Sequence, residues 1–100
     1  MKMKDGTKIT FVQDTYADMF QRLYIGAYTD EEFYGDITIN LPQLSLMEGE
    51  VFLSNDCEML VKEMIEQNYL YPFGRVGYNM GSYLIAKVSQ KLLDELKGGE

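Results

Sequence analysis

The chain has 100 residues, a formal net charge of −7 at neutral pH and no histidine. A chain of this length forms one domain, so we expect residues 1–100 to fold as a single unit. Its 46% hydrophobic and 25% charged residues are globular values, which exclude intrinsic disorder. The lack of histidine excludes hydrolase sites that use it as a base, and imidazole metal sites.

Cysteine usage and hydropathy indicate the compartment. Cys57 is the only cysteine, which excludes an intramolecular disulfide and favours a reducing environment. The first ten residues lack the apolar core of a signal peptide, and no apolar run reaches the roughly 18 residues of a membrane span. We therefore expect a cytoplasmic protein without a membrane partner, a cofactor or a bound metal.

Alternating apolar and polar residues predict three strands in the first half of the chain. They lie at Thr7–Gln13, Gln21–Tyr28 and Phe33–Leu41. Asp14–Met19 breaks the pattern and predicts a loop or a single helical turn. Thr29–Glu32 is a polar connection of hairpin length, so the second and third strands form the clearest hairpin in the chain.

This predicted hairpin has an apolar and a polar face. The alternation places the following side chains inward: Leu23, Ile25, Ala27, Phe33, Ile37, Ile39 and Leu41. The outward face then carries Tyr24, Tyr28, Tyr34, Asp36, Thr38 and Asn40. Pro42 ends the third strand because proline has no amide proton to give to a ladder.

The next elements are a short strand and the main helix. A strand at Val51–Leu53 leads into a helix that Ser54 or Asn55 can cap. Its apolar stripe has helical spacing and consists of Cys57, Leu60, Val61, Met64 and Ile65. Membership of this stripe favours Cys57 as a core residue over a reactive thiol. Asn68 is a suitable left-handed terminator of the helix.

The last third of the chain predicts turns, a strand and a closing helix. Tyr69–Ser82 contains Pro72 and several glycines, so we expect a turn-rich segment. Tyr83–Val88 is apolar and predicts a strand, after which Ser89 can cap a helix with a stripe of Leu92, Leu93 and Leu96. The order of elements predicts an α+β domain: a largely antiparallel sheet of four to five strands, with one main helix and a C-terminal helix packed on one face.

Acidic residues are concentrated in the middle of the chain. Between Tyr28 and Glu66, Lys62 alone opposes ten carboxylates: Asp30, Glu31, Glu32, Asp36, Glu48, Glu50, Asp56, Glu58, Glu63 and Glu66. Such a surface repels phosphate backbones, which disfavours direct nucleic-acid binding, and attracts basic protein surfaces. The simpler alternative is a solvated surface that only keeps the protein in solution.

Tyrosines give the sharper signal for a binding surface. The candidate partner-binding residues, called the hairpin surface below, are Tyr24, Tyr28, Asp30, Glu31, Glu32, Tyr34 and Asp36. Tyrosine offers rigid amphipathic contact area and is enriched at interface centres. The alternative is that the C-terminal helix or the segment 69–78 covers these tyrosines. The carboxylates alone match no calcium-loop pattern, so we expect no metal there.

A second candidate is the glycine-rich run 74–82, in which Gly74, Arg75 and Gly77 could cradle a phosphate. Its spacing matches neither the P-loop nor the dinucleotide fingerprint, and tight turns explain the glycines more simply. The corresponding alternative function is a sensor of small ligands or nucleotides.

Three short motifs resemble one known family. They are Ile37-Thr38-Ile39-Asn40-Leu41-Pro42, Phe52-Leu53-Ser54-Asn55-Asp56 at the start of a helix, and Tyr71-Pro72-Phe73-Gly74-Arg75 followed by Tyr83. The chain from Leu23 to Val88 resembles a small domain-of-unknown-function family encoded on conjugative elements and phages of Gram-positive gut bacteria. Family members usually have a shorter link before the helix and lack the closing helix.

This resemblance implies a setting and no catalytic residues. The setting is that of an accessory protein of a mobile element or phage, and small acidic proteins there often bind host defence proteins. We therefore expect a non-enzymatic inhibitor of a defence nuclease, such as a CRISPR effector or a restriction enzyme, that occupies a basic nucleic-acid-binding surface. An accessory protein that acts by self-association is a further alternative.

Overall fold

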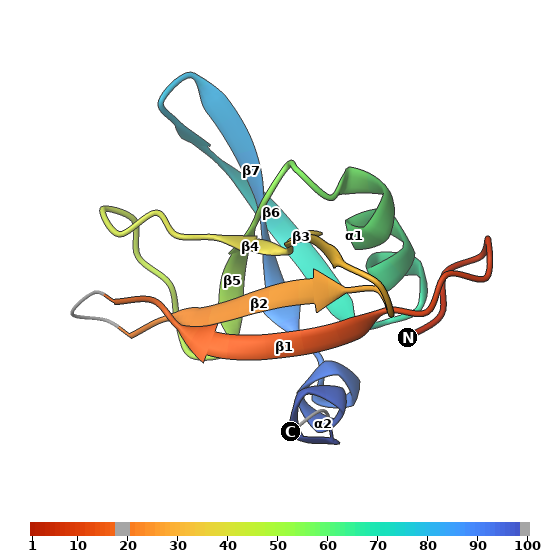
Figure 1. The fold of residues 1–100 in the computed structure, drawn as a ribbon. Coiled ribbons are helices and arrows are strands. Elements are labelled where there is room, and N and C mark those ends of the chain that lie inside the picture. Colours follow the sequence, from red (N-terminus) through yellow and green to blue (C-terminus); the bar gives the residue numbers. More distant parts are fainter. Residues whose placement is uncertain (18–20, 99–100) are drawn as a thin grey trace.

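The computed structural model of the chain describes residues 1–17 and 21–98, which form two antiparallel sheets and two helices (Figure 1). The first sheet has the order β1-β2-β3, with β1 at Thr10–Thr15, β2 at Leu23–Tyr28 and β3 at Phe33–Asp36. The second has the order β4-β5-β7-β6, with β4 at Thr38–Ile39, β5 at Glu50–Leu53, β6 at Leu70–Tyr78 and β7 at Gly81–Val88. The helices are α1 at Glu58–Glu66 and α2 at Gln90–Gly98. The predicted α+β class is confirmed.

The chain passes from the first sheet into the second at Ile37. Its amide donates to the carbonyl of Ile25 in β2 at 2.9 Å, and its carbonyl accepts from the amide of Ser54 after β5 at 2.8 Å. Because one residue bonds to both sheets, the predicted strand Phe33–Leu41 is divided into β3 and β4. The expectation of a single sheet of four to five strands is therefore wrong.

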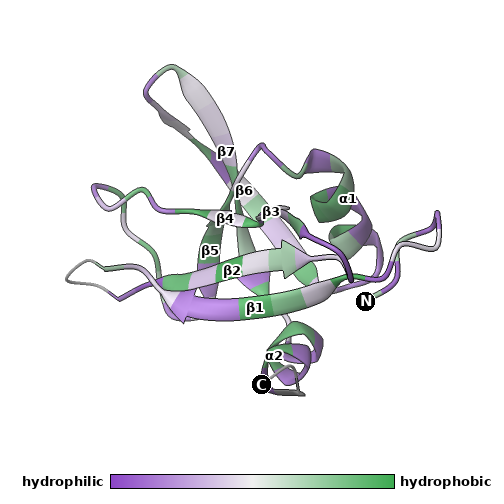
Figure 2. Cartoon of the chain, viewed as in Figure 1, coloured by the Kyte–Doolittle hydropathy of each residue, from purple (hydrophilic) through white to green (hydrophobic). Residues whose placement is uncertain are grey.

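The hydrophobic core lies between the two sheets and the apolar sides of the helices. Leu60 and Met64 of α1, and Leu92 and Leu96 of α2, are buried in the same cluster as Ile25 of β2. Figure 2 shows hydrophobic residues on α1 and the central strands, while the peripheral loops are mostly hydrophilic. No helix in the described part of the chain is long and apolar enough to cross a membrane.

The helix ends agree only in part with the sequence. Asn68 has a φ of +64° after α1, and the Ser89 hydroxyl accepts the amide of Leu92 at 3.0 Å, so the terminator of α1 and the cap of α2 are confirmed. The predicted cap of α1 is wrong, because Ser54 instead accepts the amide of Asp56 at 3.1 Å. Asn55 donates from its side chain to the carbonyl of Ser82 at 3.1 Å, which ties the start of α1 to β7.

The prediction of turns over Tyr69–Ser82 is wrong. Nearly all of it belongs to β6 and β7, which pair from Leu70↔Val88 to Tyr78↔Gly81 and are joined by a two-residue turn. The register shifts between Pro72 and Gly74, so the proline and glycine mark a local irregularity within a strand. Pairing with β7 along the whole strand outweighs the low intrinsic preference of glycine for strands.

The first strand begins and ends later than predicted. Thr7 and Lys8 belong to an N-terminal turn, in which the amide of Met3 donates to the carbonyl of Thr7 at 2.8 Å. Asp14 and Thr15 are paired with β2, so the loop predicted from Asp14 to Met19 does not start there. Residues 18 and 19 of that prediction lie outside the described residues.

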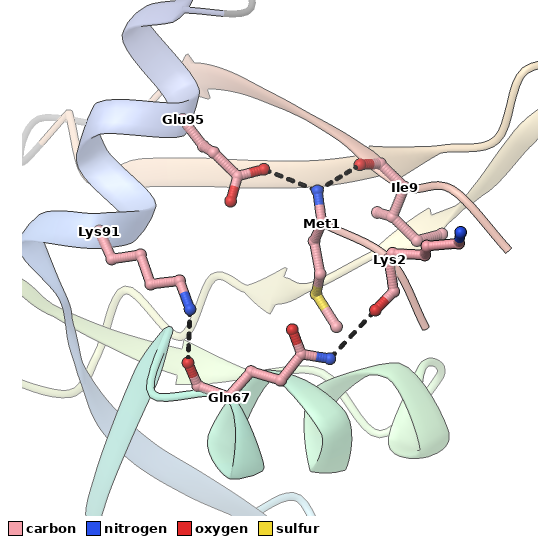
Figure 3. A network of polar contacts seen from close by, with 6 residues as sticks. All are labelled: Met1, Lys2, Ile9, Gln67, Lys91 and Glu95. Carbon is pink, nitrogen blue, oxygen red and sulfur yellow. Dashed lines mark hydrogen bonds and ion pairs between the residues drawn. The ribbon is translucent and has the colours of Figure 1, made fainter. Parts of the chain in front are cut away.

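Polar contacts tie the first residues to both helices (Figure 3). The Met1 ammonium forms an ion pair with Glu95 of α2 at 2.8 Å. The Gln67 side chain, at the end of α1, donates to the carbonyl of Lys2 at 3.1 Å, and the Lys91 ammonium of α2 donates to the carbonyl of Gln67 at 2.9 Å. The N-terminal segment is thereby fixed against the ends of α1 and α2.

Candidate functional site

The turn between β2 and β3 is held by a threonine. The amide of Thr29 donates to the carbonyl of Glu32 at 2.9 Å, which closes the turn. The Thr29 hydroxyl oxygen accepts the amides of Glu31 at 3.3 Å and Glu32 at 3.1 Å. A side chain that accepts successive amides in this way fixes a polar turn locally. The acidic residues therefore sit on an ordered turn.

Aromatic side chains lie beside this turn. Tyr28 and Phe33 are register partners, and their rings meet edge to face with centroids 5.1 Å apart. Tyr28 is 41% exposed, Phe33 47% and Tyr34 39%. These three side chains remain accessible, so neither of the layers considered in the sequence analysis covers Tyr28 or Tyr34.

Tyr24 has a different environment from Tyr28 and Tyr34. Its hydroxyl donates to the Asp36 carboxylate at 2.5 Å, and its ring packs edge to face on Tyr16 with centroids 5.7 Å apart. The phenol lies over Gly26, where an added Cβ would be 2.4 Å from the Tyr24 oxygen. Burial and the hydrogen bond to Asp36 raise the pKa of Tyr24 above its usual range. Tyr24 and Asp36 therefore form a structural pair at the border of the hairpin surface.

Within the described residues, the carboxylates of the turn have no basic partner. In residues 1–17 and 21–98, ion pairs join Met1 to Glu95 and Lys4 to Glu66, and none involves Asp30, Glu31 or Glu32. All three residues are exposed. Their negative charge is therefore uncompensated within the described chain and available to a cation outside it.

Two predicted orientations in this hairpin are wrong. Phe33 was expected to point inward but is exposed, and Thr38 was expected to point outward but is 3% exposed. The Thr38 hydroxyl shares a hydrogen bond of 2.8 Å with Tyr16, and its oxygen accepts the amide of Ile25 at 3.2 Å. The register shift between Ala27 and Tyr28 places Phe33 opposite Tyr28 on the outer face. Thr38 follows the passage of the chain at Ile37 and pairs with Leu53 in the second sheet, so its side chain does not follow the alternation of β3.

Phe33 is the site residue that the sequence analysis missed. Gly35 is the signal that could have revealed it, since a glycine inside a strand often marks a bulge or a close approach. Gly35 does lie at a close approach, because an added Cβ would be 2.4 Å from the Cys57 sulfur. Cys57 itself is buried, as predicted, and burial raises the pKa of its thiol.

The alternative ligand residues Gly74, Arg75 and Gly77 lie in strand β6 and form no loop. Arg75 donates to the Ser82 hydroxyl at 3.2 Å. Arg75 also lines a groove of about 400 Å³ between α1 and the β6–β7 hairpin. The apolar floor of the groove is formed by Leu53, Val61, Ile65 and Leu84. Its charged rim is formed by Glu58, Lys62, Glu66 and Arg75.

Comparison of the chain with models of known protein families, with curated proteins and with solved structures gives no match. Among the described residues, no group of three or more carboxylates or thiols is arranged to hold a metal ion. The only guides to the role of the hairpin surface, to which Phe33 is now added, are therefore its geometry and its charge.

Proposed function

We propose that this is a non-enzymatic binding protein of a mobile element or phage that inhibits a host defence nuclease. The hairpin surface docks on a basic surface with which a CRISPR effector or a restriction enzyme grips nucleic acid. The observation that carries the proposal is the edge-to-face pair of Tyr28 and Phe33 beside three exposed carboxylates that have no basic partner in the described part of the chain.

The chemistry of this surface suits such a partner. Partly exposed aromatic rings supply contact area at low entropic cost, because they are already packed against each other. The carboxylates of Asp30, Glu31 and Glu32 supply long-range attraction, which speeds encounter with a positively charged channel. The ordered turn reduces the entropy that binding must remove. The setting on a mobile element rests on the resemblance of Leu23–Val88 to the family named above.

The test measures association with purified DNA-cleaving enzymes, namely a CRISPR nuclease and a set of restriction enzymes, and inhibition of their cleavage. Reversal of Asp30, Glu31 and Glu32 to lysine should slow association by about tenfold or more. Raising the salt from about 50 mM to about 500 mM should slow the wild type in the same way, because screening shortens the reach of the charges.

The matched control reverses three exposed carboxylates elsewhere, Glu48, Glu58 and Asp94, and changes the net charge equally. This control should retain most of the association rate of the wild type. If both triple variants slow association equally, the effect depends on net charge alone and the hairpin surface is not the docking site. Association that does not respond to salt would rule out the electrostatic mechanism.

The groove beside Arg75 supports a second candidate function, the binding of a small anionic ligand with an apolar body. Lys62 and Arg75 supply the positive groups on a rim that Glu58 and Glu66 share, and the apolar floor supplies the contact area. A nucleotide at 100 times its Kd would raise the free energy of unfolding by about 2.7 kcal/mol in a thermal-shift screen. If Arg75→Ala leaves every shift intact, this candidate is wrong.

A further inference from the structure

The groove between α1 and the β6–β7 hairpin has a floor without aromatic rings. The four side chains of this floor are all aliphatic: Leu53, Val61, Ile65 and Leu84. None of the other residues that line the groove in the described chain is aromatic either. Proteins commonly hold nucleic-acid bases by stacking them on aromatic rings. An aliphatic floor instead suits an aliphatic chain, which gains from burial of its methylenes.

Strand β6 offers no cradle for a phosphate. Such a cradle needs successive backbone amides that converge on one anion, as in a glycine-rich loop. Gly74 and Gly77 are instead paired with Ile85 and Ser82 in the ladder of β6 with β7. Successive amides of a strand point in opposite directions, so those of β6 do not converge. Side chains alone therefore hold an anion at this groove.

Two cations on the rim have no carboxylate in ion-pair contact within the described part of the chain. They are Lys62 of α1 and Arg75 of β6, although acidic residues outnumber basic ones by 16 to 9. The Glu66 carboxylate on the same rim is engaged by the Lys4 ammonium at 2.7 Å. Glu58 is then one carboxylate against two cations, which leaves an excess of one positive charge on the rim. This excess is complementary to a single anionic group.

Arg75 is the better placed of the two cations. It donates to the Ser82 hydroxyl at 3.2 Å, and the Asn55 side chain donates to the Ser82 carbonyl at 3.1 Å. These bonds connect β6, β7 and the segment before α1 beside the groove. A guanidinium has five N–H groups, so Arg75 retains donors that can bind a carboxylate with two parallel bonds. Lys62, by contrast, has a glutamate one helical turn away on either side.

The floor is long enough for several methylenes. Val61 and Ile65 are four residues apart in α1, which is about 6 Å along the helix axis. Leu84 is the register partner of Arg75, so apolar contact is available directly beside the cation. The groove volume of about 400 Å³ lies within the range of small-molecule sites. An alkyl chain can therefore cover the floor while its charged end remains at Arg75.

We infer that the groove binds a medium-chain fatty acid, whose carboxylate pairs with Arg75 and whose alkyl chain lies on the aliphatic floor. The inference rests on the second candidate function given above and narrows its ligand from any anion with an apolar body to an aliphatic carboxylate. One charged contact and a few methylenes give weak binding, with a Kd of about 0.1 to 1 mM. The hairpin surface belongs to other elements, so docking on a nuclease does not depend on this site.

The test is a titration of the full chain with octanoate, followed by NMR of the methyl groups. Octanoate should shift the signals of Val61, Ile65 and Leu84 until they saturate. From hexanoate to octanoate, each added methylene should tighten binding by about two- to fourfold. Octanol, which lacks the charge, and AMP, which replaces the chain by a base and a phosphate, should each bind about tenfold more weakly than octanoate or worse.

Three variants locate the carboxylate. Arg75→Gln removes the charge but keeps a polar side chain, and should weaken octanoate binding about tenfold. The matched control is Lys87→Gln, which removes one positive charge from an exposed residue of β7 that does not line the groove and should leave the Kd unchanged. Glu58→Gln removes the opposing carboxylate of the rim and should tighten binding by about two- to fivefold.

Octanoate that shifts none of the floor methyl groups overturns the inference. Equal weakening by Arg75→Gln and Lys87→Gln, or equal binding of octanol and octanoate, overturns it as well, because the carboxylate would then have no specific partner. If AMP binds more tightly than octanoate, the inference is wrong while the second candidate function stands. If neither binds, the groove is not an anion site and both are wrong.

Discussion

The hairpins β2–β3 and β6–β7 are built from similar residues but have opposite relations to the rest of the molecule. The first packs its inner face against the core, where Gly35 approaches Cys57, and carries carboxylates at its turn. The second extends away from the body with its turn far from the helices (Figure 1) and has no acidic residue. Burial of one face makes a strand intolerant of added atoms, whereas an extended hairpin tolerates them and leaves an edge open.

Two matched glycine variants should show this difference most strongly. Gly35→Ala should lower the free energy of unfolding by about 2 kcal/mol, because the new Cβ would lie 2.4 Å from the buried Cys57 sulfur. Gly74→Ala should change it little, because an added Cβ at Gly74 has no atom within 4 Å. Urea denaturation of both variants measures the two changes.

The double variant Gly35→Ala, Cys57→Ala serves as the control, because it removes the sulfur that the new methyl meets. Its coupling energy should be favourable, so that the double variant is more stable than the sum of the single changes predicts. Equal losses of unfolding free energy in Gly35→Ala and Gly74→Ala would show that both hairpins are equally constrained, contrary to the difference described above.

The turns of the two hairpins should respond in opposite directions. Met80 has a left-handed φ of +65°, which is costly for a residue with a side chain. Met80→Gly should therefore raise the free energy of unfolding by about 1 kcal/mol and produce an Asn-Gly turn, the pair best suited to this geometry. Thermal and urea unfolding measure the gain, and a loss of stability would contradict the assigned turn.

Thr29→Ala tests the acidic turn. The variant loses a hydroxyl that accepts the amides of Glu31 and Glu32. Since the turn is exposed, we expect a loss of only about 0.5 kcal/mol in the free energy of unfolding. Faster amide hydrogen exchange at Glu31 and Glu32 should be the clearer signal, with Thr29→Ser as the conservative control that restores protection.

The comparison also shows what the sequence reveals about the fold. The pattern of Cys57, Leu60, Val61 and Met64 repeats within two turns, so α1 and its buried face could be predicted. The hairpin β6–β7 could not, because glycine and proline are common to turns and to irregular strands. The pairing register with β7 decides whether such residues form a turn or a strand, and the local sequence does not contain that register.

The candidate site depends on the same non-local information. Strict alternation places Tyr24 and Tyr28 on one face of β2, as predicted, but a register shift exposes Phe33 and the passage into the second sheet buries Thr38. Both depend on pairing with strands that are distant in the sequence. The carboxylates of the turn escape this problem, because turn residues are exposed in either register.

The smallest effect should appear only in alkaline solution, at the base of the β6–β7 hairpin. Burial and a hydrogen bond to Glu95 raise the pKa of Tyr69, the residue before β6, to about 12. The folded chain therefore retains a proton that the unfolded chain releases near pH 10. By linkage this contribution to stability is complete below about pH 10 and is lost as the pH rises toward 12. Tyr69→Phe has no proton to lose, so its free energy of unfolding should fall less steeply across this window than that of the wild type. Parallel slopes would show that another group controls the alkaline transition.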